Sequence, residues 1–150
     1  MILNIDRPAD IVVVEGWCWG VLAQKEAELA EPTNRLEQQQ DSKGLWRSYV
    51  NQQLKEHYQP LYKLFDYWIA LQAPSFDCVY RWRLEQEQKL ALMLKSTGKP
   101  TEQSAVMSAE QAPDFIQYFQ RLAERSITTL PSFDDTILFL DKNRHIQSVQ

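Results

Sequence analysis

Glycine is scarce in this sequence, and its placement excludes one common phosphate-binding motif. The 150 residues include four glycines, Gly16, Gly20, Gly44 and Gly98, and none of them forms the GxxxxGK[ST] pattern of a P-loop. The nearest match, STGK at Ser96–Lys99, lacks the first glycine and lies between two predicted helices with no strand before it. We therefore predict that this chain carries no loop that cradles the phosphates of a nucleotide.

Cysteines and long apolar runs are scarce as well. Cys18 and Cys78 lie far apart without a CxxC or His-rich context, so we predict neither a disulfide framework nor a zinc site, and we expect reduced thiols. No apolar run approaches the roughly 18 residues that a membrane span needs. The amino-terminal residues MILNIDRPAD also lack the features of a signal peptide. The composition therefore predicts a cytoplasmic protein without a membrane partner.

Positive charge is not in excess. The chain has 16 Lys and Arg against 20 Asp and Glu, which gives a formal net charge of -4. This balance argues against a nucleic-acid partner, and any phosphate site must be local. Hydrophobic residues make up 44% of the sequence, enough for the core of one domain of this length, so we predict a single domain over residues 1–150.

The clearest strand signal lies near the amino terminus, at Ile11–Val14. Its four β-branched residues show no polar alternation, which is typical of a strand buried on both faces of a parallel sheet. Glu15 and Gly16 follow it, and open α/β sheets bind ligands at the carboxyl ends of their strands. Two interpretations of Glu15 stay open: a carboxylate with a role in ligand binding, or one that turns to solvent as the strand ends.

The rest of the chain alternates between predicted helices and strands. Helical spacing and capping signals predict helices at residues 45–58, 76–94 and 108–129, with a capping box at Ser108 and Gln111 and a stop at Leu130–Pro131. Pro60 either ends the first of these helices or starts a new short one. Between Pro32 and Ser42 we expect a mobile connection. Strands are predicted at residues 67–71, 136–140 and 145–149, and this alternation is typical of an α/β fold with a parallel sheet.

Four segments in this order resemble the D-glycerate 3-kinase-like family of P-loop kinases, relatives of pantothenate and uridine kinases. They are VVVEGWCWG, FDYWIALQAPSFDCVYRWRLEQEQKL, MSAEQAPDFIQYFQRL and LPSFDDTILFLD. The resemblance spans Ile11 to Ile146, and its most specific part is WRLEQE after a strand and an Ala-Pro turn. It implies a three-layer, P-loop-kinase-like parallel sheet flanked by helices. Because the P-loop is missing, the chain resembles the carboxyl-terminal part of such a kinase, incomplete at its amino-terminal side.

The resemblance also implies roles for three residues. Glu15 matches the acid that ends the Walker-B-like strand, which acts on the Mg²⁺ shell or as the base for the substrate hydroxyl. Arg81 and Arg83 match arginines of the lid helix that contact ATP phosphates, and Arg83 would also take part in catalysis. The residues alone leave another interpretation open, in which Arg81–Glu85 and Arg83–Glu87 are i, i+4 pairs on a solvated helix face.

Five further positions favour a structural role over a chemical one. Trp17, Trp19 and Trp82 are expected to serve as packing or pocket wall. Arg121 and Arg125 lie one turn apart on a predicted helix, and contact with phosphate is the less favoured interpretation for either of them.

Two function classes follow from the resemblance and the missing P-loop. In the first, the chain is part of an ATP- and Mg²⁺-dependent kinase for a small hydroxy acid such as glycerate, with a P-loop from elsewhere. In the second, it is a non-catalytic, truncated kinase-like interaction domain. The resemblance implies that the P-loop strand would lie between Ile11–Val14 and Tyr67–Leu71, so we expect open strand edges. These edges predict either a P-loop-bearing partner chain or a homo-oligomer.

Overall fold

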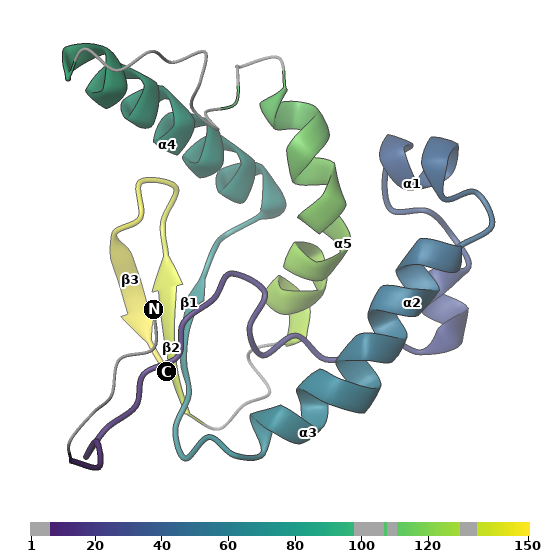
Figure 1. Cartoon of the computed structure of the whole chain (residues 1–150), viewed down its shortest axis with the longest axis horizontal. Coiled ribbons are helices and arrows are strands. Elements are labelled where there is room, and N and C mark those ends of the chain that lie inside the picture. Colours follow the sequence, from purple (N-terminus) through teal and green to yellow (C-terminus); the bar gives the residue numbers. More distant parts are fainter. Residues whose placement is uncertain (1–6, 98–106, 108–110, 130–134) are drawn as a thin grey trace.

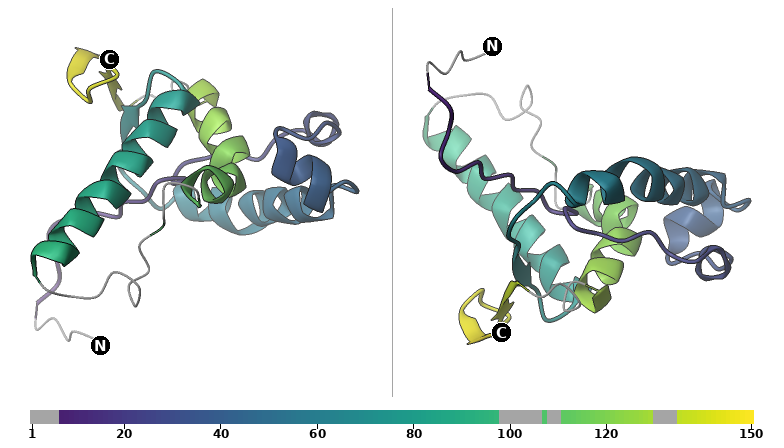
Figure 2. Two further views of the ribbon diagram at one scale, coloured as in Figure 1. Left: turned by 90° about the horizontal axis from the view of Figure 1, so that it is seen from above. Right: turned by 90° about the horizontal axis from the view of Figure 1, so that it is seen from below.

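The computed structural model describes residues 7–97, 107, 111–129 and 135–150. It is a mixed α/β structure in which α5 lies between two groups of elements, a small sheet with α4 on one side and the helices α1 to α3 on the other (Figures 1 and 2). The elements in chain order are η1 (Glu26–Leu29), α1 (Arg35–Gln40), α2 (Leu45–Gln53), the π-helical η2 (Leu54–Tyr58), α3 (Gln59–Tyr62), β1 (Ile69–Gln72), α4 (Phe76–Ser96), α5 (Ala112–Thr129), β2 (Thr136–Leu140) and β3 (Ile146–Val149).

The sheet has the order β1-β2-β3. β1 and β2 are parallel, with Ile69 opposite Thr136, whereas β2 and β3 are antiparallel. The chain reverses between β2 and β3 because Asp141 organises a tight turn, in which its Oδ1 accepts from the amides of Asn143 (2.7 Å) and His145 (2.8 Å). The strands predicted at residues 67–71, 136–140 and 145–149 are confirmed, the first shifted to Ile69–Gln72 and the last shortened to Ile146–Val149, but the sheet is mixed and not purely parallel.

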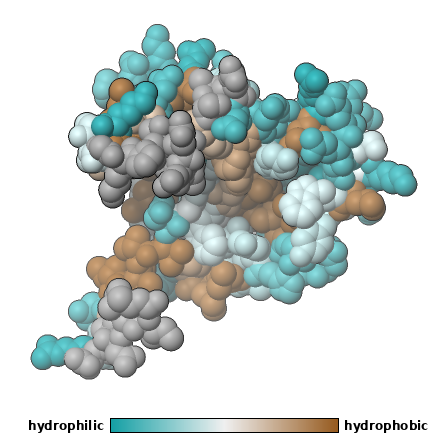
Figure 3. Space-filling view, turned by 45° about the horizontal axis from the view of Figure 1, so that its top comes forward, coloured by the Kyte–Doolittle hydropathy of each residue, from teal (hydrophilic) through white to brown (hydrophobic). Residues whose placement is uncertain are grey.

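The predicted buried strand at Ile11–Val14 is wrong in this structure. The segment forms no strand, and its side chains are 45% to 83% exposed. In the space-filling view, hydrophobic side chains gather at the lower left, near the start of the described chain (Figure 3). A strand needs a neighbour to take its backbone hydrogen bonds, and no described strand pairs with these residues.

The predicted helices are confirmed, with different ends. α2 continues through the π-helical η2 into α3, which has Pro60 in its first turn, so this proline starts a short helix. α4 begins after Ser75, whose side chain accepts from the amide of Cys78 (3.4 Å). α5 buries Ala112, Ile116 and Ala123 along one face. The predicted capping residue Ser108 and the predicted stop at Leu130–Pro131 lie outside the described residues.

The predicted mobile connection between Pro32 and Ser42 is wrong, because it contains the helix α1. Asn34 caps α1 by accepting from the amide of Glu37 (3.0 Å), and its own Nδ2 donates to the carbonyl of Gln117 on α5 (2.8 Å). One side chain therefore both starts α1 and fixes it against α5. Segment Val21–Ala30, which is compatible with a helix by sequence, forms only the short η1.

Both cysteines are free thiols, as predicted. Burial raises the pKa of the Cys18 thiol to about 11, so it stays protonated at neutral pH. Among the described helices, none has the length and hydrophobicity to cross a membrane.

Candidate functional site

Arg81 lies near the start of α4 and is largely exposed. Its guanidinium reaches back one turn to Asp77 (3.3 Å), and both side chains are more than two thirds exposed. The alternative pairing of Arg81 with Glu85 is not formed, because Glu85 instead pairs with Lys89 and with Arg144 from the β2–β3 turn. An exposed pair of this kind contributes little to stability and leaves Arg81 free to change partners.

Arg83 is held much more firmly. It pairs with Glu87 one turn later (2.5 Å), as the i, i+4 interpretation predicts, and Gln86 accepts from its Nη1 (3.1 Å). Glu87 is buried, and its second oxygen accepts from the amide of Met107 (3.1 Å). This pair is therefore a half-buried anchor and not part of a solvated face. The Nε of Arg83 is buried and has no hydrogen-bond partner among the described residues.

Aromatic rings connect Arg83 to the segment that follows Glu15. The Arg83 guanidinium lies over the ring of Phe115 on α5 (5.7 Å). Phe115 contacts Phe119 one turn later (5.2 Å between ring centres), and Phe119 stacks on Trp17 (5.0 Å). The row Arg83–Phe115–Phe119–Trp17 thus joins α4, α5 and the turn two residues after Glu15.

Glu15 itself is exposed and lies in coil. The described residues contain no group of three or more His, Cys, Asp or Glu side chains that could hold a metal ion. A single exposed carboxylate still fits Mg²⁺, which keeps several waters and commonly takes one or two carboxylates together with substrate phosphates. Of the three predicted site residues, Arg83 begins the aromatic row, and Glu15 lies two residues before its last member, Trp17, without belonging to it. Arg81 pairs with Asp77.

The predicted packing role of the tryptophans agrees with the structure. Trp17 belongs to the aromatic row, and Trp19 makes edge contacts with Tyr58 and Tyr62 in a second aromatic cluster. Trp82 donates from its indole nitrogen to the carbonyl of Lys142 (2.9 Å), which fixes the β2–β3 turn against α4.

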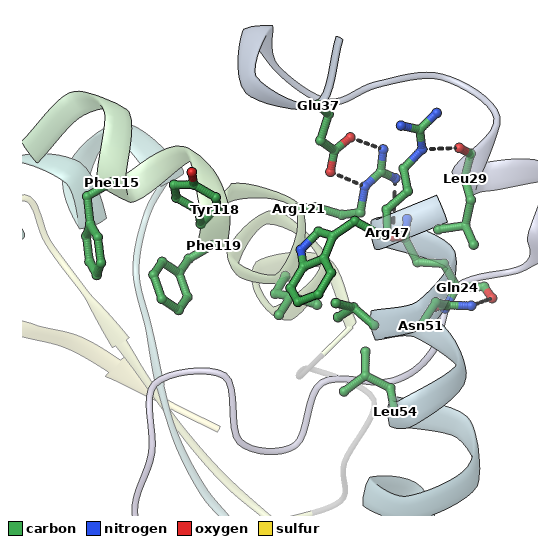
Figure 4. A pocket seen from close by; sticks show the side chains of 13 residues that line it. Gln24, Leu29, Glu37, Arg47, Asn51, Leu54, Phe115, Tyr118, Phe119 and Arg121 are labelled. Carbon is green, nitrogen blue, oxygen red and sulfur yellow. Dashed lines mark hydrogen bonds and ion pairs between the residues drawn. The ribbon is translucent and has the colours of Figure 1, made fainter. Parts of the chain in front are cut away.

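A pocket of about 390 Å³ lies between α2 and α5 (Figure 4). Its walls are mainly apolar, and one end carries two arginines with their carboxylate and amide neighbours. The lining residues are Gln24, Leu29, Glu37, Trp46, Arg47, Val50, Asn51, Leu54, Phe115, Tyr118, Phe119, Arg121 and Leu122.

Arg121 forms a two-pronged pair with Glu37 at this polar end. Its Nε and Nη2 donate to the two carboxylate oxygens at 2.8 and 2.7 Å, and Nη2 also donates to the carbonyl of Glu31 (2.7 Å). Burial alone would raise the pKa of Glu37, but hydrogen bonds from Arg121 and from the Thr33 amide outweigh it and hold the pKa below its usual value. The donors of Arg121 are therefore taken, which favours its structural interpretation over phosphate contact.

Arg47 closes the same end of the pocket from α2. Its donors go to the carbonyls of Leu29 (2.7 Å), Asp41 (2.7 Å) and Ala30 (3.2 Å), and to the Asp41 carboxylate (3.3 Å). Burial would raise the pKa of Asp41, but the amides of Trp46 and Arg47 and the Arg47 charge lower it on balance. The sequence did not predict the pairing of Arg121 with Glu37 or the hydrogen bonds of Arg47. The Asn34-x-x-Glu37 spacing is a capping signal for α1, but nothing local indicates the partners of Arg47.

Comparison with known proteins supports the resemblance. No protein-family model matches the chain. A solved D-glycerate 3-kinase from Cryptococcus neoformans var. grubii matches 99% of this chain and 51% of its own, with a TM-score of 0.71 and 23% identity. The chain has a kinase-like fold. The Schizosaccharomyces pombe protein named uncharacterized kinase mug58 is 28% identical over 136 residues, covering 89% of this chain and 46% of that protein.

This kinase-like chain spans about half the length of both relatives. The resemblance to the carboxyl-terminal part of a D-glycerate 3-kinase-like kinase is therefore confirmed at the level of the fold. The sequence identity to the solved kinase is too low to carry its activity over to this chain.

Proposed function

We propose that this kinase-like chain supplies one half of the active site of an ATP-dependent small-molecule kinase. The observation that carries the proposal is the row Arg83–Phe115–Phe119–Trp17 within a kinase-like fold. The row begins at Arg83 and ends at Trp17, two residues after Glu15, and it supports a shared site for the two residues with proposed chemical roles, Glu15 and Arg83. The P-loop would come from the half of the fold that this chain does not match.

Glu15 is the proposed base of the reaction. The acceptor hydroxyl oxygen forms a bond to the γ-phosphorus of ATP, the bond from that phosphorus to the bridging oxygen breaks, and ADP leaves. The hydroxyl proton passes to the Glu15 carboxylate. Bound Mg²⁺ would neutralise charge on the phosphates, and Glu15 is the residue of this chain suited to its shell.

The two arginines differ in how they could serve the phosphates. Arg83 is pre-oriented by Glu87 and Phe115, so little side-chain entropy is lost when it meets a phosphate oxygen. Arg81 is bound only by an exposed pair and can exchange Asp77 for a phosphate at small cost. Both guanidinium groups can stabilise the charge that develops during phosphoryl transfer.

We propose a small hydroxy acid as the acceptor, in line with the activity named for the solved relative. The α2–α5 pocket is not the acceptor site in this proposal. The donors of Arg47 and Arg121 are already taken by chain carbonyls and carboxylates, and the remaining lining is mainly apolar. A small carboxylate such as glycerate would gain no charged partner there.

Reconstitution tests the proposal. The chain is mixed with the half of the Cryptococcus kinase that it does not match, and ADP formation from Mg-ATP is followed with and without D-glycerate. We expect acceptor-dependent ADP formation from the mixture and none from either half alone. Two halves that associate without turnover for any small hydroxy acid would favour the non-catalytic interaction domain.

A further inference from the structure

The α2–α5 pocket has the size and the lining of a site for a small organic molecule. Its volume of about 390 Å³ lies within the range of about 300 to 1,000 Å³ that is typical of such sites, and its walls are mainly apolar. Leu29 and Leu54 line it and are buried, whereas Trp46 on α2 and Tyr118 on α5 line it and are 60% and 55% exposed. The pocket therefore runs from a buried floor to an open mouth between two aromatic side chains.

The charges at the polar end of the pocket cancel. Arg121 pairs with Glu37 (2.7 Å) and Arg47 pairs with Asp41 (3.3 Å), and these four side chains are only 5% to 11% exposed. The Arg121–Glu37 pair is drawn in Figure 4. An anionic ligand would find no free cation here, and burying an unpaired charge is costly. This end of the pocket therefore suits a neutral ligand.

Gln24 provides a hydrogen-bond donor at the same end. Its Oε1 accepts from Nη1 of Arg121 (3.4 Å), and no described residue accepts from its Nε2. The backbone of Gln24 is bound to the side chain of Asn51, with its amide donating to Oδ1 (2.7 Å) and its carbonyl accepting from Nδ2 (3.0 Å). A free N–H on a residue held in this way suits a ligand with an acceptor oxygen, such as a carbonyl.

Two rings of the pocket wall also belong to the aromatic row. Phe115 and Phe119 line the pocket, and Figure 4 shows both projecting from α5. The guanidinium of Arg83 lies over the ring of Phe115 (5.7 Å), and Phe119 stacks on Trp17 (5.0 Å). A molecule in the pocket would therefore contact the same two rings that contact Arg83 and Trp17.

We propose that the α2–α5 pocket binds a small neutral molecule with an aromatic body and one acceptor oxygen, and that its occupancy changes the surroundings of Arg83 through Phe115. A cavity of about 150 Å³ holds benzene, so a pocket of about 390 Å³ has room for two fused rings. The rings of Phe115, Phe119 and Trp46 favour an aromatic ligand through stacking and edge contacts.

This second ligand site goes beyond the proposed function. Binding in the pocket requires neither ATP nor an acceptor, so it stands whether or not the chain is half of a kinase. An effect of the bound molecule on phosphoryl transfer would follow from the contact of Phe115 with Arg83 and would rest on the proposed function.

Two probes with the same ring system test the ligand class. 2-Naphthamide is neutral and has a carbonyl oxygen, whereas 2-naphthoate is an anion of the same shape. In a nuclear magnetic resonance titration of the chain, we expect one-to-one binding of 2-naphthamide, with a dissociation constant lower than that of 2-naphthoate by about tenfold or more. Tighter binding of 2-naphthoate would show that a cation of the pocket is available and would overturn the proposal. Absence of 2-naphthamide binding at about 1 mM would overturn it as well.

A variant that fills the pocket shows where the probe binds. Val50 lines the pocket, so Val50→Phe should weaken 2-naphthamide binding by about tenfold or more. Val149→Phe is the matched control, because Val149 is exposed on β3 and does not line the pocket. Circular dichroism checks that both variants fold. Native affinity in a folded Val50→Phe chain would place the probe elsewhere and overturn the proposal.

A second variant decides the question if Val50→Phe does not fold. Gln24→Leu removes the free donor and should weaken 2-naphthamide binding by about 2- to 10-fold, the effect of one hydrogen bond. Gln52→Leu is its control, since Gln52 is exposed on α2 and does not line the pocket. Equal binding by Gln24→Leu and Gln52→Leu would overturn the proposal.

The link to Arg83 is measured without any catalytic readout. The Nε of Arg83 is buried, so its N–H resonance can be observed and can be assigned with Arg83→Lys. We expect this resonance to shift when 2-naphthamide saturates the pocket, while the Nε–H resonance of the exposed Arg81 does not. A saturated pocket without a shift at Arg83 would overturn the proposal. So would release of the probe by the unmatched half of the Cryptococcus kinase, which would assign the pocket to a segment of that half. A shift at Arg83 together with an inactive reconstituted kinase would overturn the proposed function alone.

Discussion

Arg83 lies between a buried carboxylate and an aromatic ring, with its guanidinium paired to Glu87 at 2.5 Å and its carbon Cζ 5.7 Å from the centre of the Phe115 ring. The carboxylate belongs to the same helix, and the ring belongs to α5. Arg83 therefore links α4 to α5 as well as being a proposed phosphate contact. The two roles are separable by experiment.

Arg83→Ala should lower the free energy of unfolding by about 1 to 3 kcal/mol, because it leaves the buried Glu87 carboxylate without its cation. Arg81→Ala, which removes only an exposed pair, should change it by less than about 0.5 kcal/mol. Urea unfolding monitored by circular dichroism measures both. Equal losses for the two variants would contradict the anchoring role of Arg83.

Arg83→Ala also separates the role of Arg83 in activity from its role in stability in the reconstituted kinase. At a temperature where Arg83→Ala keeps its helicity, we expect it to abolish turnover, since the pre-oriented guanidinium is lost. Added Glu87→Gln should recover stability, by removing the unpaired charge, without recovering turnover. Full activity of Arg83→Ala would return Arg83 to a purely structural role.

The chain alone should bind Mg-ATP only weakly. It has no GxxxxGK[ST] loop, and that loop supplies most contacts to the β- and γ-phosphates in P-loop kinases. We expect a dissociation constant above about 1 mM, which corresponds to roughly -4 kcal/mol. Isothermal titration calorimetry tests this, and a micromolar constant would show that another part of the chain holds the nucleotide.

Acid should destabilise the fold through Glu37. Its pKa in the folded chain lies below the ordinary 4.5, so its contribution is fully present above that value and is lost as the pH falls through the folded pKa. Glu37→Gln should therefore be less stable at neutral pH and should lose less stability on acidification. Urea unfolding between about pH 6 and pH 3 measures the slope, with Glu26→Gln on the exposed side of η1 as control. If the free energy of unfolding fell equally with pH in Glu37→Gln and in the native chain, the stabilising role of the Arg121–Glu37 pair would be contradicted.

Gly44→Ala should destabilise the α2 end of the pocket. Gly44 has φ +68°, and an added Cβ would lie 3.2 Å from three guanidinium atoms of the buried Arg47. The left-handed backbone alone costs about 1 to 2 kcal/mol for a residue other than glycine. Gly16→Ala is the control, since its added Cβ would meet only Trp19 at an ordinary 3.6 Å. Thermal unfolding compares the two variants, and an unchanged midpoint for Gly44→Ala would be unexpected.

Helices and strands with a repeating pattern of apolar residues could be predicted from the sequence. Segments whose structure depends on contacts with distant parts of the chain could not. α4 and α5 have repeating apolar faces, and β2 matches its predicted range of residues 136–140. Ile11–Val14 has the composition of a strand, but composition does not supply the pairing strand that its backbone needs. α1 lies in a Gln-rich run whose helical signal is limited to the cap at Asn34.

In the candidate site, too, local contacts could be predicted from the sequence and long-range contacts could not. Arg83–Glu87 follows from i, i+4 spacing on one helix. The contact of Arg83 with Phe115, the pairing of Arg121 with Glu37 and the bonds of Arg47 join residues far apart in the chain. No local pattern carries such contacts, so they required the structure.

In the proposed function, Glu15 belongs to the active site of a kinase completed by the P-loop-bearing half. The most direct measurement is transfer of labelled γ-phosphate from ATP to D-glycerate by the reconstituted kinase carrying Glu15→Gln, beside the native chain and the Glu26→Gln control. Gln cannot accept the hydroxyl proton, so we expect turnover to fall by about 100-fold or more with docking unchanged. Native turnover in Glu15→Gln would exclude Glu15 as the base, and no turnover from a correctly docked native pair would exclude the proposed kinase.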